Sequence, residues 1–214
     1  MSLSDVAYRR FKDRLFDHTI DLGAVMTQGQ LSEMLDVPVT PLRDAIRTLH
    51  SEGLVEILPR NGIRIVRPGM EIIRHTYQMR RLIEKEAVSH FCSVCSQEEI
   101  DRFRSTHDAV EERMRAGLRQ PELGDAIEGM EREFHDTMVG SLGNPYIDAV
   151  YAQAGDRIKV IRIDRRYVIT PPLVQKTIAE HRAVIESLER RNVAASVKAM
   201  ELHMSSALQR AMGL

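Results

Sequence analysis

The sequence predicts a mostly α-helical protein, with an N-terminal winged helix-turn-helix followed by a C-terminal antiparallel six-helix bundle. Short amphipathic stretches and one hairpin signal occupy the first third of the chain. Six longer stretches then show apolar residues at helical spacing. Residues that favour helices dominate the composition, and a hydrophobic content of 43% over 214 residues is enough for a core.

Three short helices are expected before the hairpin. The first covers about 6–18, where apolar residues recur at helical spacing. The second begins after Thr27, because a threonine oxygen can accept a hydrogen bond from the first turn. Thr40 is expected to cap the third helix in the same way, with Pro41 at its first position, where the missing N–H of proline does no harm. This helix is expected to stop at Gly53.

Residues 54–58 and 63–66 are expected to pair as a hairpin across Asn61-Gly62. Asn-Gly is a strong hairpin signal because both residues accept positive φ. Three helices followed by a hairpin make a winged helix-turn-helix, which we place at residues 1–69. The chain is expected to divide near Arg67-Pro68-Gly69.

Residues 70–214 are expected to form a second, all-α domain. Short connections between amphipathic helices favour an antiparallel bundle, because neighbouring helices then pack side by side. The predicted helices cover about 70–92, 97–119, 122–141, 145–168, 172–190 and 193–212.

The third helix and the hairpin are candidates for reading DNA. Arg43 and Arg47 lie one turn apart on one helix face, and arginine can bind guanine through two hydrogen bonds. Thr40 can reach a phosphate or a base. The expected wing tip adds Arg60, Asn61 and Gly62. The alternative is that the arginines only form a solvated face. A net charge of −1 argues against a non-specific nucleic-acid coat and favours a local contact patch.

Three histidines on apolar faces of separate predicted helices form a candidate metal site. Glu131 and His135 are four residues apart and share one helix face. His181 and His203 lie at nearly equal distances from a predicted turn at 191–192, so antiparallel neighbours would hold them at one height. One carboxylate and three imidazoles suit a divalent ion with open positions for water or a ligand. The alternative is that each histidine is hydrogen-bonded in the core and Glu131 pairs with a basic residue.

Residues 31–46, LSEMLDVPVTPLRDAI, with EGLV at 52–55, resemble the N-terminal domain of the GntR family of bacterial regulators. The family pattern reads roughly L-A-x-x-L-x-V-S-R-T-P-V-R-E-A-L, then L-x-x-E-G-L-V. This resemblance implies a homodimer on pseudo-palindromic, double-stranded operator DNA. Pro38 and Val39 replace the usual Ser and Arg, which moves the expected readout onto Thr40, Arg43 and the wing.

The second half of the chain resembles the FCD ligand-binding domain of the FadR subfamily within GntR, and six helices suit its VanR-like branch. The family's D-x-x-F-H is similar to residues 131–135, its E-H to 180–181, and its late histidine to His203. The resemblance implies a divalent metal ion, Zn or Ni, that helps to bind a small carboxylate effector. Glu131 replaces the usual Asp, and the extra methylene leaves open whether it is a direct ligand.

YQMRRLIE at 77–84 is similar to the family's Y-x-x-R-x-x-L-E on its first bundle helix. The resemblance implies effector contacts from Tyr77, Arg80, Glu84 and Asn144. An inward arginine beside a metal is suited to clamp a carboxylate, since its fork fits two oxygens. The alternative for Arg80 is a buried pair with Glu84. Asn144 is also expected to cap the helix that starts at Pro145.

We therefore expect a cytoplasmic, dimeric transcription regulator, and not an enzyme, whose operator affinity is controlled by a small organic acid bound next to a metal ion. A metal-responsive regulator without an organic effector and a helical-bundle metalloenzyme are the alternatives. No apolar run is long enough to cross a membrane. The two cysteines, Cys92 and Cys95, are expected to be buried or idle thiols.

Overall fold

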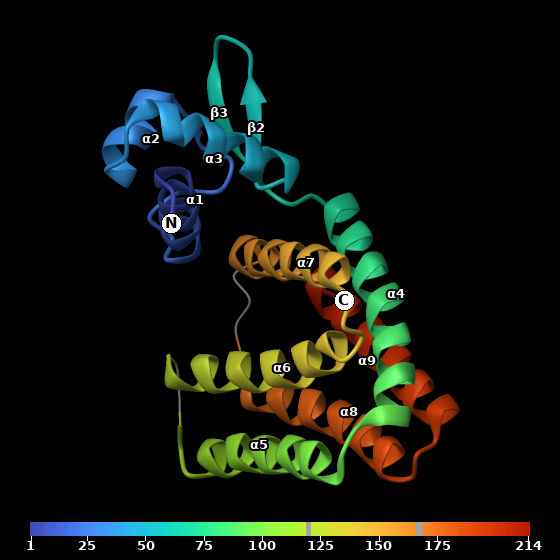
Figure 1. Ribbon diagram of the computed structural model, residues 1–214. Helices are drawn as coiled ribbons and strands as arrows, with labels where there is room; N and C mark the ends of the chain where they lie inside the picture. Colours follow the sequence, from blue (N-terminus) through green and yellow to red (C-terminus); the bar gives the residue numbers. More distant parts are fainter. Residues whose placement is uncertain (119–120, 166–168) are drawn as a thin grey trace. The chain divides into compact units, whose positions relative to one another are not determined.

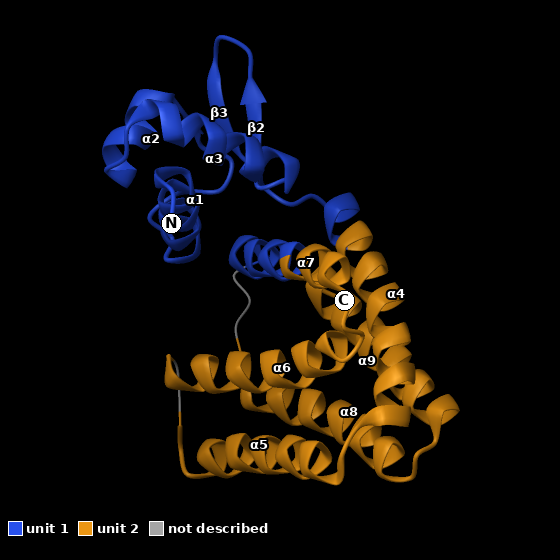
Figure 2. Ribbon diagram, viewed as in Figure 1, with its two compact units in different colours: residues 1–73, 153–167 blue, residues 74–152, 168–214 orange. Residues whose placement is uncertain are grey.

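The computed structural model describes residues 1–118, 121–165 and 169–214 (Figure 1). The chain forms two compact units, coloured separately in Figure 2. Unit 1 contains residues 1–73 and 153–167, and unit 2 contains residues 74–152 and 168–214. Helix α7 (Pro145–Asp164) therefore has its first part in unit 2 and its second part in unit 1. The functional domain bounds at 69 and 70 stay a prediction.

Unit 1 has the expected winged helix-turn-helix, with one additional short strand. Its elements are α1 (Leu3–Phe16), β1 (Val25–Met26), α2 (Gln28–Leu35), α3 (Val39–Ser51), β2 (Val55–Leu58) and β3 (Gly62–Ile65). The strands form an antiparallel sheet in the order β1-β3-β2, in which Ile57 lies opposite Ile63 across the hairpin. Strand β1 was not predicted, because two residues are too few to show an alternating pattern.

Of the two capping predictions for unit 1, one is confirmed and one is wrong. Thr27 caps α2, and its side chain accepts a hydrogen bond from the Gln30 N–H. The prediction that Thr40 caps α3 is wrong, because Pro38 is the N-cap. The Pro38 carbonyl already accepts the first helical hydrogen bond, from the N–H of Leu42 at 3.2 Å. Thr40 and Pro41 therefore lie inside the first turn.

The core of unit 1 determines which face of α3 remains outside. Phe11 of α1, Leu31 of α2, Leu42 of α3 and Ile65 of β3 are completely buried in one apolar cluster. Val160, from the second part of α7, belongs to the same cluster. Since the apolar stripe of α3 faces this core, its arginines face outward.

Unit 2 contains the six helices expected of the bundle, apart from the parts of α4 and α7 that belong to unit 1. Besides α7, they are α4 (Met70–Val94), α5 (Gln97–Arg115), α6 (Glu122–Gly140), α8 (Pro171–Glu189) and α9 (Val193–Met212). The predicted positions at 119 and 166–168 lie outside the described residues.

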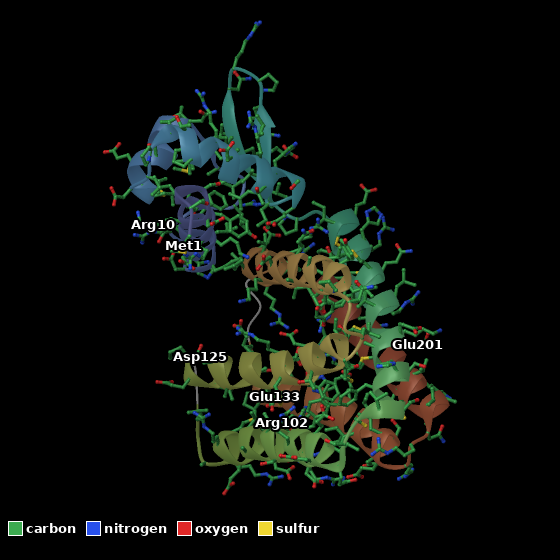
Figure 3. All side chains as sticks on the ribbon, in the orientation of Figure 1. Met1, Arg10, Arg102, Asp125, Glu133 and Glu201 are labelled. Atoms are coloured by element: carbon green, nitrogen blue, oxygen red, sulfur yellow. The ribbon has the colours of Figure 1, made fainter. Side chains whose placement is uncertain are left out.

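Helices α5, α6 and α8 lie side by side in unit 2 (Figure 1). Arg102 of α5 and Glu133 of α6, both labelled in Figure 3, form an ion pair at 3.0 Å. Helix α9 follows α8 after a turn in which Arg191 has a φ of 51°. Cys92 and Cys95 are buried free thiols, as expected. In the described part of the chain, no helix has both the length and the apolar character needed to span a membrane.

Gly62 gives a test of the wing geometry. Its φ is +103°, and a Cβ there would lie 2.6 Å from the Met26 carbonyl oxygen on the neighbouring strand. We expect Gly62→Ala to lower the free energy of unfolding by about 1–3 kcal/mol, measured by urea denaturation, because alanine is strained at this φ and clashes with backbone. Gly69→Ala is the matched control, since nothing lies within 4 Å of its Cβ position. Equal losses in both variants would contradict this account of the wing.

Candidate metal centre and DNA-reading surface

Three imidazoles and one carboxylate converge inside unit 2. Glu131, His135, His181 and His203 each offer one ligand atom, and these atoms all lie within 4.8 Å of one another. The three histidines are 0–2% exposed. Helix α6 supplies Glu131 and His135, while α8 and α9 supply one histidine each. The structure thus brings together the four residues that the sequence pattern placed at one site.

Local geometry explains the convergence. On α6, the four-residue spacing turns Glu131 and His135 to the same side. The turn between α8 and α9 then places His181 and His203 at the same height, with their Nε2 atoms 3.2 Å apart. The Glu131 Oε1 atom lies 3.5 Å from His181 Nε2. The Glu131 side chain is 15% exposed, but its Oε1 atom is buried.

Hydrogen-bond partners engage the other nitrogen of each ring. His135 Nδ1 lies 2.5 Å from Glu84 Oε2, and His203 Nδ1 lies 2.9 Å from Glu180 Oε2. Because an ionised carboxylate can only accept, both rings donate from Nδ1. In the neutral rings, Nε2 is then unprotonated and faces the other ligand atoms. His181 Nδ1 makes its contact with a fourth histidine, His107, at 2.8 Å.

The protonation states suit a cation site. Burial lowers the pKa of His135, and burial together with the neighbouring histidines lowers the pKa of His181 well below its usual value. Burial alone would raise the pKa of Glu84, but Arg80 and then His135 bring it down to about 2. These directions favour neutral imidazoles at His135 and His181 beside an ionised carboxylate at Glu84.

The Nε2 atom of His135 is the observation that tests whether the cluster suits a metal. It is buried without a hydrogen-bond partner among the described residues, which is costly for a polar atom. Imidazole nitrogen and carboxylate oxygen are ligands that Zn and Ni accept. Ligand atoms about 2.1 Å from one zinc ion are at most about 4.2 Å apart. A small side-chain movement would thus suffice to bring the four atoms around one ion.

Arg80 lies beside the cluster and is paired with Glu84. Its Nε donates to Glu84 Oε1, which also accepts a hydrogen bond from the Tyr151 hydroxyl at 2.9 Å. Arg80 is only 8% exposed and Glu84 1%. The ion pair is the alternative that the sequence left open. Direct effector contacts from Arg80 and Glu84 remain a prediction.

The other two predicted effector residues lie in different settings. Tyr77 is 6% exposed on α4. The Asn144 side chain accepts hydrogen bonds from the N–H groups of Tyr146 at 3.0 Å and Ile147 at 3.4 Å. Its expected role as the cap of α7 is confirmed. Effector binding by Tyr77 and Asn144 stays a prediction.

Sequence reasoning missed two polar residues of this site. His107 continues the buried stripe of Ile100 and Phe103 on α5, and Tyr151 lies on the buried side of α7 with Ala154. Their spacing from these buried residues is typical of inward-facing side chains. That periodic signal was available, but it does not say which side chain lies opposite.

The DNA-reading candidates lie on the outer surface of unit 1. Thr40, Arg43 and Arg47 are exposed on α3, opposite its buried leucines. Arg43 Nε donates to Gln28 Oε1 at 2.9 Å, which joins the two helices of the helix-turn-helix. The wing tip exposes Arg60 and Asn61, while Gly62 is half-buried in the sheet. This arrangement presents arginines and the wing together, as major-groove readers of this type do. The predicted turn at Asn61-Gly62 is wrong in its position, because Gly62 already pairs with Leu58 in the sheet and the positive φ before it belongs to Arg60, not Asn61.

A winged helix-turn-helix with outward-facing arginines, followed by a helical domain, is typical of DNA-binding transcription regulators. The model of the bacterial regulatory proteins of the gntR family matches residues 3–65, and the FCD domain model matches residues 75–206. The chain therefore belongs to the GntR family of regulators that carry an FCD domain.

Curated relatives agree with this assignment. The chain is 23% identical over 203 residues to the HTH-type transcriptional regulator YdhC of Bacillus subtilis, covering 92% of this chain and 86% of that protein. It is 21% identical over 202 residues to the HTH-type transcriptional repressor RspR of Escherichia coli, covering 92% and 83%. Both relatives are named as transcription regulators.

Solved structures share the fold. McbR/YncC of E. coli superposes with a TM-score of 0.76 at 15% identity, over 100% of this chain and 98% of that chain. A GntR regulator from a Rhodococcus species gives 0.73 at 18% identity, over 100% and 99%. At such low identity the similarity supports the fold alone.

Arg43 gives a test of the reading surface. We expect Arg43→Ala to weaken binding to a duplex selected by the wild-type protein from a random library about 5- to 150-fold, because a bidentate contact to guanine contributes about 1–3 kcal/mol. Fluorescence anisotropy measures the affinity, and circular dichroism checks the fold. Arg190→Ala, which changes an exposed arginine at the C-cap of α8, is the matched control. Unchanged binding by Arg43→Ala would remove this residue from the reading surface.

Proposed function

We propose that this regulator changes its operator affinity when a small organic acid binds next to a divalent ion, Zn or Ni, held by Glu131, His135, His181 and His203. The observation that carries the proposal is the approach of the four ligand atoms to within 4.8 Å. Glu84, His107 and Glu180 engage the Nδ1 atoms of the three rings, which supports coordination of an ion through Nε2. When bound, the ion supplies positive charge and open coordination positions for a carboxylate.

Arg80 is the second anchor in this proposal. Its contacts to Glu84 and Tyr151 use Nε, on one edge of the guanidinium. A planar guanidinium offers five donors, so its other edge suits two carboxylate oxygens. Glu84 contacts both Arg80 and the His135 ring, so a displacement of Arg80 is passed on to a metal ligand. Effector binding and metal binding are therefore coupled through Glu84.

In this proposal, helix α7 transmits effector binding to the DNA-binding unit, because it is one continuous helix with a part in each unit. Tyr151, in its first part, donates to Glu84. In its second part, Asp156 pairs with Lys12, and Arg157 donates to the Glu52 carbonyl at 2.9 Å. A ligand that binds one conformation of Tyr151 more tightly than another shifts the population toward that conformation, and with it the position of α7. We further infer a homodimer, since one winged helix reads only one half-site of a pseudo-palindromic operator.

A metal-responsive regulator without an organic effector is the second candidate. The ion pair between Arg80 and Glu84 favours it, because the guanidinium already has a carboxylate partner. The burial of the three histidines also leaves little exposed surface for a larger ligand. The two candidates share the metal site and differ in whether an acid is needed.

The metal ligands are tested first. We expect His181→Ala and His203→Ala each to lower bound zinc from about one ion per chain to near zero, because a site of four ligands loses one donor. The rise in thermal unfolding temperature on adding zinc should disappear with it. Elemental analysis and differential scanning calorimetry measure the two effects. His90→Ala, at an exposed position on α4, is the control. Wild-type zinc content in both site variants would show that the site is misplaced.

The effector is tested separately. Operator affinity is measured on zinc-loaded and chelator-treated protein, each titrated with mono-, di- and tricarboxylates. We expect one class of acid to change the affinity about 5- to 150-fold, corresponding to about 1–3 kcal/mol of coupling, and only with zinc present. Arg80→Lys, which keeps the charge but loses the planar fork, should reduce this effect. If chelation alone changed the operator affinity by this amount and no acid had an effect, the metal-responsive candidate would be favoured.

A further inference from the structure

His107 is a fourth buried histidine that touches the metal centre without joining the ligand set. It lies on α5, is 1% exposed, and its Nε2 is 2.8 Å from His181 Nδ1. Its own Nδ1 is 2.6 Å from the carbonyl oxygen of Phe103, one turn earlier on the same helix. The ring therefore bridges a backbone carbonyl and a metal-ligand candidate.

These contacts determine which ring nitrogen of His107 and of His181 carries the proton. A carbonyl oxygen can only accept, so His107 Nδ1 carries the hydrogen and donates to Phe103. In the neutral ring, His107 Nε2 is then an acceptor, and His181 Nδ1 must donate to it. His181 Nε2 is left unprotonated, 3.2 Å from His203 Nε2 and 3.5 Å from Glu131 Oε1. The lone pair of His181 faces the other ligand atoms.

Packing sets the ring plane of His181, whereas hydrogen bonding determines which of its ring nitrogens carries the proton. Its ring stacks on Phe134, with centroids 4.1 Å apart and planes 16° apart, and this contact sets the ring plane. His107 packs edge-on against the same phenyl ring at 5.4 Å. Stacking cannot distinguish the two ring nitrogens, because it acts on the face of the ring. The contact with His107 makes that distinction.

The partner of His181 differs in charge from the partners of the other two rings. His135 and His203 donate to Glu84 and Glu180, which are paired with Arg80 and Arg210. A neutral imidazole at His107 orients His181 without adding another negative charge. A divalent ion beside Glu131 would thus keep net positive charge for an acidic ligand.

We propose that His107 is a positioning residue of the metal centre, which fixes the tautomer of His181 and keeps its Nε2 available for the ion. This inference rests on the proposed metal-binding function. Partners of this kind orient ligand histidines, and their loss typically costs 10- to 100-fold in metal affinity.

Two substitutions test this role through zinc affinity, measured by competition with a chromogenic chelator. His107→Phe removes the acceptor, and we expect about 10- to 100-fold weaker zinc binding. His107→Gln keeps an oxygen that can accept from His181 Nδ1, and zinc affinity should stay within a few-fold of the wild type. His90→Phe, at an exposed position on α4, controls for the loss of a histidine.

The tautomer itself provides a readout that packing alone would not move. In the metal-free protein, ¹⁵N NMR of labelled histidine should show the His181 proton on Nδ1, and His107→Phe should shift it to Nε2. A proton on Nε2 in the wild type overturns the proposal, even if His107→Phe fails to fold. Unchanged zinc affinity of folded His107→Phe also overturns it, whereas absence of zinc binding by the wild type overturns the metal-binding function instead.

Discussion

The buried carboxylate of Glu84 is the interaction on which the site depends. A carboxylate that is 1% exposed is stable only if it is paired and hydrogen-bonded. Glu84 meets this requirement through Arg80 on its own helix, Tyr151 on α7 and His135 on α6. One side chain of α4 therefore links three helices of the regulator and orients a candidate metal ligand. Removing any one partner would leave charge or polarity uncompensated in the core.

The same principle applies to the other two rings. His203 is oriented by Glu180, which Arg210 also contacts, and His181 is oriented by His107. Each imidazole thus has its Nδ1 engaged and its Nε2 directed to the cluster. Partners at Nδ1 of this kind orient the ligand histidines of metal sites, which agrees with the proposed metal centre. The unpartnered Nε2 of His135 is the consequence of that orientation.

Burial of apolar side chains explains the position of the predicted DNA-reading surface. The apolar stripe of α3 is buried in the core of unit 1, so its polar stripe with Arg43 and Arg47 must face outward. The second part of α7 shares this core through Val160. A single helix thus belongs partly to the histidine-containing unit and partly to the unit with the winged helix-turn-helix.

The sequence by itself determined the helices, the hairpin and the faces on which functional residues lie. Helical spacing put Glu131 with His135, and equal distances from one turn placed His181 level with His203. Only the tertiary structure decided that Arg80 pairs with Glu84, that His107 and Tyr151 join the site, and that the second part of α7 packs in unit 1. Periodicity reports which side of a helix faces inward. It does not report which side chain, far along the chain, lies opposite, because that depends on how the helices pack together.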